Sequence, residues 1–468
     1  MQAEPDSAAT RFRKIAHLLT GGMAGAVIAI PTLVLTARAL GGESYGTLAM
    51  IVSYIAFIKR FADFQIWQPI IRYGAALDPE SDRSSYLALL KYGLVVDLAA
   101  SLTGWLIGVG GAIVALELLG LDTRAFQGML IYASVLLFNI NGMPIAVLRL
   151  SGRIGALAYS QLAVGALKLA LCAAAFAAQA GLLAFLAIWA LTEVLGVLLT
   201  LGLACRELGR RGLYRLDQGR LRDARALFPG IVGFSFSANI SSSLWASIQQ
   251  LDTLLVGYFV DTASAGLYFF AKRIARLAQQ LAQHVQTVVY PDLARLWASA
   301  DRRAFQRVIL QTEALLAICG ILMILGTFAL ASEVIALLAG EGFRLAGTYL
   351  TVQMVAVTLI LCGSVLRSGL LAMGRADIVL IAAMTASGAF YLVAVTLLPL
   401  AGVVGANIAH IAASLIWLTI QAVMVFRLRR RHHQADEEMA RGPAGSAGCR
   451  PVGVSAVTIR ARRATRGR

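Results

Sequence analysis

The chain has 468 residues, of which 59% are hydrophobic and 14% are charged, and its mean hydropathy is +0.74. This composition excludes the ordinary classes of soluble domain and is typical of a protein that crosses a bilayer many times. The net charge of +16 would suggest a nucleic-acid partner in a soluble protein, but the basic residues lie in short loops and at both ends, which is a topology signal and argues against nucleic acid.

Long apolar runs follow one another along the whole chain. One helical crossing of the hydrocarbon core needs about 20 apolar residues. Twelve runs of sufficient length predict twelve transmembrane helices, near residues 15–38, 46–71, 86–118, 127–148, 155–177, 183–204, 229–258, 265–290, 308–330, 347–371, 379–398 and 405–426. The expected parts are a tail 1–14, a first lobe 15–204, a linker 205–228, a second lobe 229–426 and a basic tail 427–468 for which disorder is expected.

The two halves of the chain repeat one pattern. Residues 33–50 align with residues 253–270 without a gap, so that Ser44 corresponds to Ser264 and Gly46 to Gly266. The period is that of a duplicated membrane bundle and is far too long for a short-repeat solenoid. Because each copy holds six predicted spans, an even number, we expect two parallel lobes related by a pseudo-two-fold axis along the membrane normal, around a central cavity.

The loops carry a strong charge asymmetry. If the N-terminus is cytoplasmic, the inner segments hold 19 Lys and Arg residues, whereas the outer segments hold only Arg124 and Arg344. Positive residues in short loops stay on the cytoplasmic side. We therefore expect both tails in the cytoplasm, and the linker 205–228 as an amphipathic helix on the inner surface.

Three stretches of sequence resemble a known family of transporters. They are ARALGGESYG after the first span, QLDTLLVGYFVDTASAGLYFFAKRI over spans seven and eight, and ALLAGEGFRLAGTYL followed by VLRSGLLAMGRAD around span ten. They are similar to the polysaccharide-exporter and lipid-linked oligosaccharide flippase branch of the multidrug/oligosaccharidyl-lipid/polysaccharide exporter superfamily. The resemblance covers about residues 15–427 and keeps its order. It implies a V-shaped pair of six-helix lobes with a water-filled cavity that opens to each side in turn. It also implies that cations in the cavity hold the pyrophosphate of a polyprenyl-linked glycan while the lipid tail stays in the bilayer.

Basic residues lie deep inside several predicted spans. A charge in the hydrocarbon layer is costly, so such a residue faces protein or a watery cavity. The candidates for substrate binding are Lys59, Arg60, Lys168, Lys272, Arg273 and Arg276. Two structural alternatives stay open: Lys59 could pair with Asp63 four residues on, and Lys168 could pair with Glu193 or Asp97.

Span eight carries a polar stripe. Lys272, Arg276, Gln279, Gln283 and Gln286 recur at steps of four and three, which places them on one face of a helix. A continuous polar stripe must face something wetter than lipid, so we expect a cavity wall; polar contacts between helices are the alternative. Span seven is also rich in hydroxyl and amide side chains, and Asn239 is expected to line the same cavity.

Three carboxylates are candidates for coupling to Na⁺ or protons, namely Asp97, Glu193 and Asp63. They could equally be counter-charges for the bases. The five cysteines lack CxxC spacing and no GxxxxGK[ST] phosphate loop occurs, so we expect no metal site, no cofactor and no ATP-driven step.

These features together predict a flippase that moves a polyprenyl-diphosphate-linked oligosaccharide across the bacterial inner membrane by alternating access. Its product would serve assembly of lipopolysaccharide, capsule or exopolysaccharide, with a polysaccharide polymerase as a candidate partner. One alternative is a cation-coupled drug antiporter, which needs acidic residues to dominate the cavity. A membrane glycan polymerase or ligase is less well supported, because the longest outer connection, near 331–346, holds too few charged residues for catalysis. We therefore expect a transporter and not an enzyme.

Overall fold

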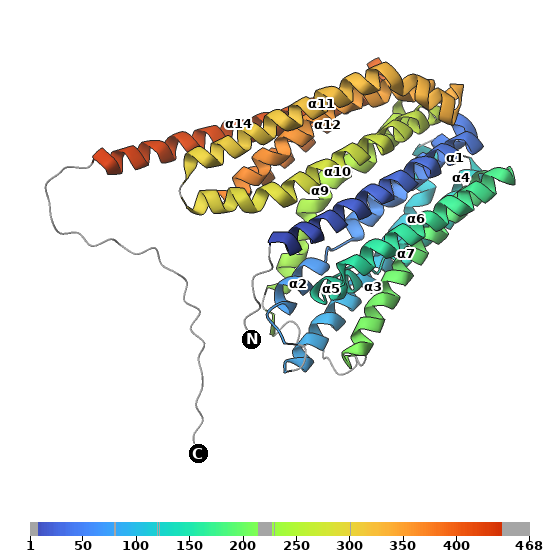
Figure 1. Cartoon of the computed structure of the whole chain (residues 1–468). Helices are drawn as coiled ribbons and strands as arrows, with labels where there is room; N and C mark the ends of the chain where they lie inside the picture. The colour runs from blue at the N-terminus through green and yellow to red at the C-terminus, as the bar shows by residue number, and fades with distance from the viewer. Residues whose placement is uncertain are drawn as a thin grey trace. The chain divides into compact units, whose positions relative to one another are not determined.

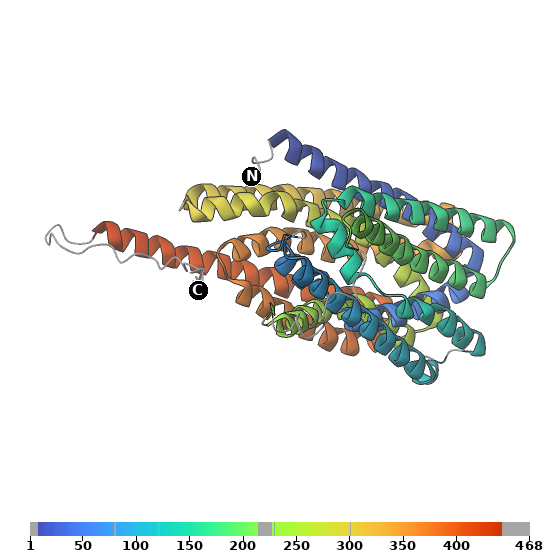
Figure 2. The ribbon, with the colours of Figure 1, turned by 90° about the horizontal axis from the view of Figure 1, so that it is seen from below.

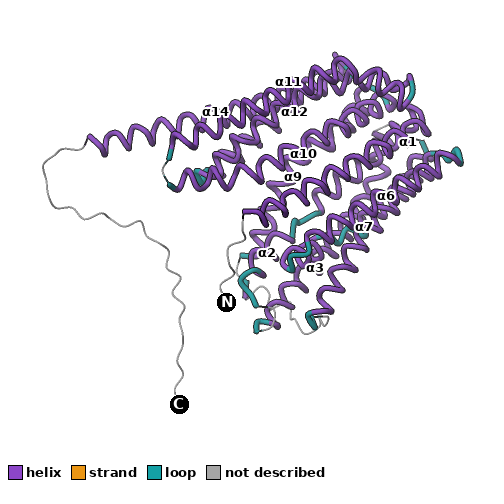
Figure 3. The backbone as a smooth tube through the Cα atoms, in the orientation of Figure 1, coloured by secondary structure: helices purple, strands orange, loops and turns teal. Residues whose placement is uncertain are grey.

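The computed structural model describes residues 8–78, 81–118, 120, 122–213, 227–228, 230–299 and 301–441 (Figures 1 and 3). All regular elements of this part of the chain are helical, so the predicted all-α fold is confirmed. The elements are α1 (Ala8–Ala62), α2 (Trp67–Gly74), α3 (Arg83–Leu118), α4 (Thr123–Leu137), α5 (Gly142–Leu150), α6 (Ile154–Ala177), α7 (Leu182–Arg210), α9 (Ile231–Phe259), α10 (Thr262–Ala298), α11 (Arg302–Ala339), the 3-10 turn η2 (Glu341–Phe343), α12 (Arg344–Ala372), α13 (Ala376–Ala401) and α14 (Val403–Arg441).

Seven of the described helices are long and apolar enough to cross a membrane: α3, α6, α7, α11, α12, α13 and α14. The bent pair α4 and α5 gives an eighth candidate. The protein is therefore a multi-pass membrane protein, while the layout of twelve spans in two lobes stays a prediction. Most of the linker, residues 214–226, lies outside the described residues.

Residues up to Val425 form one compact unit, and Phe426–Arg468 form a second. In the second unit α14 continues as far as Arg441, although disorder was expected from residue 427 onward. The reason is local, because this stretch is rich in Arg, Gln, Glu and Ala, which are good helix formers despite its lack of apolar periodicity.

The first two predicted spans form one kinked helix, α1. The kink is at Gly41, whose φ of 69° and ψ of 178° are readily adopted only by glycine. A single residue therefore makes the connection between these two predicted spans. We use the name kink end for the end of the bundle that contains Gly41 of α1 and residues 260–261, which connect α9 to α10.

Helix α1 links the two halves of the chain. It contacts α6, α4 and α3 of the first half and α10, α9 and α11 of the second. Figure 1 shows it running between α10 and α6, and it contacts both. Figure 2 shows the same helices seen from below, with the start of α1 at the upper edge. Within the second half α10 packs on α12, and α12 on α11. A side chain on the inner faces of α1 or α10 can therefore reach the space between the halves.

The contact between α1 and α10 is tightest at the kink end. A Cβ atom added at Gly46 would overlap the carbonyl oxygen of Thr262, and one added at Gly266 would lie 2.8 Å from the backbone nitrogen of Gly46. Beside them Tyr45 is fully buried, and its ring centroid lies 5.5 Å from that of Phe343. We call these five residues the kink-end seal. It closes this end of the space between the halves.

Predicted span four is broken. Helices α4 and α5 meet at a bend of 41° over residues 138–141, because the backbone N–H of Met143 bonds to the carboxylate of Asp97 on α3 at 2.8 Å. Gly142 allows this close approach, since a Cβ atom there would lie 2.7 Å from the same carboxylate. Asp97 is 7% exposed and fixes the start of α5.

Replacing Asp97 by alanine is expected to lower the free energy of unfolding by about 1–3 kcal/mol, because a buried N–H loses its acceptor. Thermal unfolding of the purified protein in detergent measures the loss. Asp97→Asn keeps an acceptor oxygen and should lose less than half as much. If the asparagine variant is as stable as the wild type but inactive in transport, the predicted role of Asp97 in ion coupling gains support over the structural role.

Candidate functional site

A cavity of about 560 Å³ lies between the halves of the chain. Its walls come from α1, α4, α5, α6 and α7 of the first half and from α9 and α10 of the second. On α1 it includes Lys59, which lies about 20 Å beyond Gly46 at 1.5 Å per helical residue. The cavity therefore lies deep in the bundle, on the far side of the kink-end seal.

Four cationic side chains and one carboxylate line this cavity. The cations are Lys59 on α1, Lys168 on α6, and Arg273 and Arg276 on α10, and the carboxylate is Glu193 on α7. Both halves of the chain contribute cations. The lining therefore carries a surplus of positive charge, and we call the four cations the cationic cluster.

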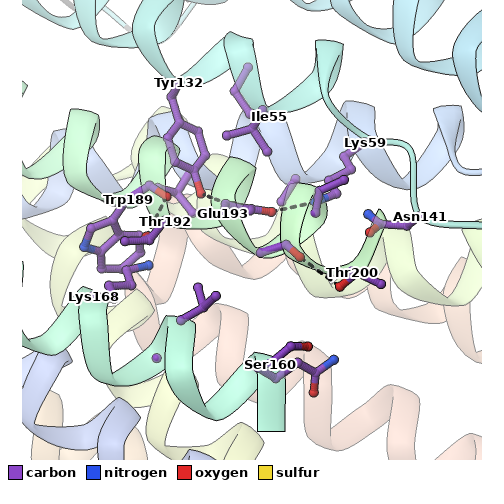
Figure 4. A pocket seen from close by; sticks show the side chains of 18 of the residues that line it. Ile55, Lys59, Tyr132, Asn141, Ser160, Lys168, Trp189, Thr192, Glu193 and Thr200 are labelled. Carbon is purple, nitrogen blue, oxygen red and sulfur yellow. Dashed lines mark hydrogen bonds and ion pairs between the residues drawn. The ribbon is translucent and has the colours of Figure 1, made fainter. Parts of the chain in front are cut away.

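Glu193 holds one member of the cluster in place. Its Oε1 atom lies 2.6 Å from Nζ of Lys59, and its Oε2 atom accepts a hydrogen bond of 2.9 Å from the hydroxyl of Tyr132 (Figure 4). The side chains of Lys59 and Glu193 are 25% and 35% exposed, so this ion pair lies at the cavity surface. It neutralises one of the four cations and leaves three.

Trp189 contacts two other members of the cluster. Nζ of Lys168 is 3.6 Å from the centroid of its ring, and Cζ of Arg273 is 5.6 Å from the same centroid. Figure 4 shows Lys168 beside Trp189. The face of an indole ring attracts cations. Trp189 therefore holds a lysine of the first half and an arginine of the second half close together, although their charges repel each other.

Arg276 is oriented by the backbone of α9, because its guanidinium donates a hydrogen bond to the carbonyl oxygen of Gln249. Among the residues whose side chains are described, this is the one hydrogen bond of its guanidinium, and Arg276 also lines the cavity. A second cavity of about 260 Å³ shares Lys168, Trp189 and Arg273 with the first. Most of its remaining lining is apolar and comes from the first part of α1 and from Leu277.

The model of one protein family matches residues 12–297 of this chain, which is more than half of its length, and that family is described as polysaccharide biosynthesis protein. The chain belongs to this family. The family relationship predicted from the sequence motifs is confirmed by this match.

Three further comparisons agree with this assignment. The inner membrane protein YghQ of Escherichia coli strain K12 is 24% identical over 287 residues, which cover 61% of this chain and 81% of that protein. The lipid II flippase MurJ in an inward closed conformation has a TM-score of 0.68 at 14% identity, over 88% of this chain and 86% of that one. An inward-facing multidrug resistance transporter of the MATE family has a TM-score of 0.67 at 13% identity, over 89% and 99%. The fold of this chain is thus similar to that of the two solved structures, a flippase and a transporter.

Lys272 is not at the cavity, contrary to the prediction. Its side chain is 1% exposed, and its ammonium group pairs with the carboxylate of Asp252, which is fully buried. The same carboxylate accepts a hydrogen bond from Tyr268 at 2.9 Å and lies 3.0 Å from Nε2 of His410 on α14. We call these four residues the Asp252 centre. Asp252 and His410 approach α10 on the face that carries Lys272, which turns the neighbouring Arg273 to the cavity.

The structure places the other predicted residues of this family member apart from the cluster. Arg60, Asp63 and Asp97 do not line the described cavity. The carboxylate of Asp63 binds the backbone N–H and side-chain amide of Gln65, at 3.1 and 2.7 Å. Asp63 therefore does not form the predicted alternative pair with Lys59, because α1 ends at Ala62.

The amide residues of the predicted polar stripe have mixed outcomes. Gln279 is half-buried but does not line the described cavity, and Gln286 accepts a hydrogen bond of 3.4 Å from Arg367 on α12, which is a contact between helices. The side chains of Gln283 and Asn239 lie outside the described part of the structure. Of the residues of α10, Arg273 and Arg276 line the described cavity.

Sequence reasoning missed the aromatic members of the site. Trp189 and Tyr132 lie in apolar runs, where an aromatic residue is most often part of the core, and both are almost fully buried. Each of these side chains can bind a polar partner, since the Tyr132 hydroxyl can form a hydrogen bond and the Trp189 ring can bind a cation. The sequence does not show that Glu193 and Lys168 are the neighbours that do so.

Proposed function

We propose that this protein moves a lipid-linked oligosaccharide diphosphate from the inner to the outer leaflet of the bacterial inner membrane, for assembly of a surface polysaccharide. The observation that carries the proposal is the cationic cluster, in which four cations from both halves face a single carboxylate. Arginine and lysine form charge-assisted hydrogen bonds to phosphate oxygens. A diphosphate would supply the negative charge that the lining lacks.

The apolar second cavity supports the same substrate class. A lipid-linked diphosphate needs an apolar surface next to the phosphate site, and the two cavities share Lys168, Trp189 and Arg273. Hydroxyl and amide groups that line the same cavity, from Ser160 and Gln161 on α6 and from Asn141, suit the hydroxyl groups of sugars. An organic cation is a poor match, because the lining holds one carboxylate that is already paired.

The proposed cycle uses exchange between two conformations and no covalent step. With the kink-end seal closed, substrate would enter from the cytoplasmic side, on which we also place both chain ends. Opening of the seal would then release it to the other side. The cations of α10 would move with the second half of the chain. The binding of a diphosphate between the halves would therefore depend on the relative position of the two halves.

Replacing Lys168, Arg273 or Arg276 singly by alanine is expected to reduce export by about tenfold or more, because each change removes a charged hydrogen bond worth about 1.5–3 kcal/mol. Each variant is expressed in a strain that lacks the wild-type gene. The amount of surface polysaccharide measures export, and the amount of each variant in the membrane is measured in parallel. Arg295→Ala is the matched control: it lies on α10 as well, but its side chain is 74% exposed and pairs with Asp292. It should retain export close to wild type.

Purified protein in vesicles separates this proposal from the antiporter alternative. The flippase should translocate a fluorescent polyprenyl-diphosphate oligosaccharide and leave an organic cation such as ethidium on its own side. Normal export by all three alanine variants at normal abundance would show that the cationic cluster has no role in transport. Transport of ethidium and not of the lipid-linked oligosaccharide would show that the protein is an antiporter and not a flippase.

A further inference from the structure

A second basic pocket lies away from the cavity, where α7 ends before the linker. Its volume is about 210 Å³. Arg153, at the start of α6, and Arg206 and Arg210, on the last turns of α7, line it together with Glu207. The pocket shares none of its lining residues with the cationic cluster, so its role is independent of the proposed function.

One carboxylate serves several arginines at this pocket. Glu207 is 11% exposed, and its oxygens lie 3.3 Å from Nε of Arg153 and 3.1 Å from Nε of Arg211. Arg210 approaches the same carboxylate only to 3.9 Å, and Arg206 makes no ion pair with any residue that the structure describes. Three guanidinium groups and one carboxylate thus line the pocket, a surplus of two positive charges.

The surface beside this pocket is apolar and exposed. Along α7, Leu199 lies one turn before the lining residue Leu203 and is 40% exposed. Along α6, Tyr159 follows the lining residue Ala156 by three residues and is 65% exposed. Residues three or four apart lie on one helix face. Both helices are apolar enough to cross a membrane, so these faces contact acyl chains.

We propose that this pocket binds the phosphate of an anionic phospholipid headgroup, such as phosphatidylglycerol, whose acyl chains lie along the adjacent faces of α6 and α7. One guanidinium group can donate two parallel hydrogen bonds to two phosphate oxygens. Basic pockets between membrane helices on the cytoplasmic side suit such headgroups. The charge of the pocket alone would also accept free phosphate. The apolar faces that begin one turn deeper favour a lipid.

The test measures lipid-dependent stability of the full-length protein after removal of lipid. Phosphatidylglycerol is expected to raise the midpoint of thermal unfolding relative to phosphatidylcholine. The double variant Arg206→Gln, Arg210→Gln should lose more than half of that rise. Arg303→Gln, Arg307→Gln is the matched control, because it removes two exposed arginines with the same spacing from α11, and it should keep the whole rise. The single variant Arg206→Gln breaks no described ion pair, and it should lose a smaller part of the rise in the unfolding midpoint.

Two results would overturn the proposal. An equal loss in both double variants would mean that phosphatidylglycerol acts on surface charge in general. A full rise with inorganic phosphate in place of the lipid would mean that the pocket takes a free anion. Native mass spectrometry provides a readout that does not depend on stability: one phosphatidylglycerol fewer should stay bound to the Arg206, Arg210 variant than to the control.

Discussion

Replacing Asp252 by alanine is expected to remove most of the folded protein, because Lys272 would keep a positive charge in the interior without a partner. Its ammonium also contacts the hydroxyl of Thr253 and the carbonyl oxygen of Gln249, but neither oxygen carries a charge. Breaking a buried ion pair costs about 3–5 kcal/mol. That loss is a large share of the roughly 5–15 kcal/mol by which proteins are stable.

The folded fraction of Asp252→Ala, seen as a monodisperse peak in size-exclusion chromatography, and its thermal midpoint measure this loss. Lys272→Met should lose stability as well, whereas the double variant Asp252→Ala, Lys272→Met removes both charges and should recover more than half of the loss. Asp292→Ala is the control, on α10, since its exposed ion pair with Arg295 is worth about 1 kcal/mol or less. If Asp252→Ala is as stable as Asp292→Ala, the Asp252 centre is not buried in the native protein.

Replacing Gly46 by leucine is expected to abolish transport while leaving the protein in the membrane. The new side chain would overlap the backbone of Thr262, which cannot move away as a flexible side chain would. Overpacking costs about 1–3 kcal/mol or more, and here it falls only on the conformation in which the kink end is closed. The equilibrium should therefore shift toward the open conformation by about tenfold or more.

Cysteine labelling can detect this shift directly. In a background without the five native cysteines, Ala263→Cys places a thiol on the face of α10 that meets Gly42 across the contact. Gly46→Leu should speed its reaction with a water-soluble maleimide. Gly110→Leu is the control, because nothing lies within 4 Å of a Cβ atom at that position of α3. An unchanged labelling rate together with normal export would show that the kink-end seal does not need Gly46.

We expect Tyr45 to keep the closed state of this seal reversible. Its ring packs against Phe269, Phe270 and Phe343, but its buried hydroxyl makes no hydrogen bond to any described residue. An unsatisfied buried hydroxyl is costly, and water would satisfy it once the ring leaves. The apolar packing and the unpaired hydroxyl thus oppose each other, which lowers the difference in free energy between the closed and open states.

Apolar run length predicts an all-helical membrane protein, because it is a local property of the sequence, and the quoted motifs lead to the family of this protein. Run length does not predict that span four is broken or that a helix extends to Arg441. Residue type also identifies Lys168, Arg273 and Arg276 as unusual, since an ionised side chain in a membrane helix needs a special environment whatever the fold. The depth of each residue along its helix follows from the regular helical rise.

The partner of each charge could not be predicted, because it comes from a distant part of the chain. Lys272 and Arg273 are neighbours with the same charge, and only the approach of Asp252 from α9 and His410 from α14 decides which one is buried. Lys59 pairs with Glu193 of α7 and not with nearby Asp63, because α1 stops before Asp63. The break between α4 and α5 likewise depends on Asp97 of another helix.

The meeting of Gly46 with Gly266 joins two positions that the internal repeat makes equivalent. Neither position has room for a side chain, because a Cβ atom at Gly46 would overlap the backbone of Thr262 and one at Gly266 would meet the backbone of Gly46. A larger residue at either position would therefore have to push the two helix backbones apart at the same place.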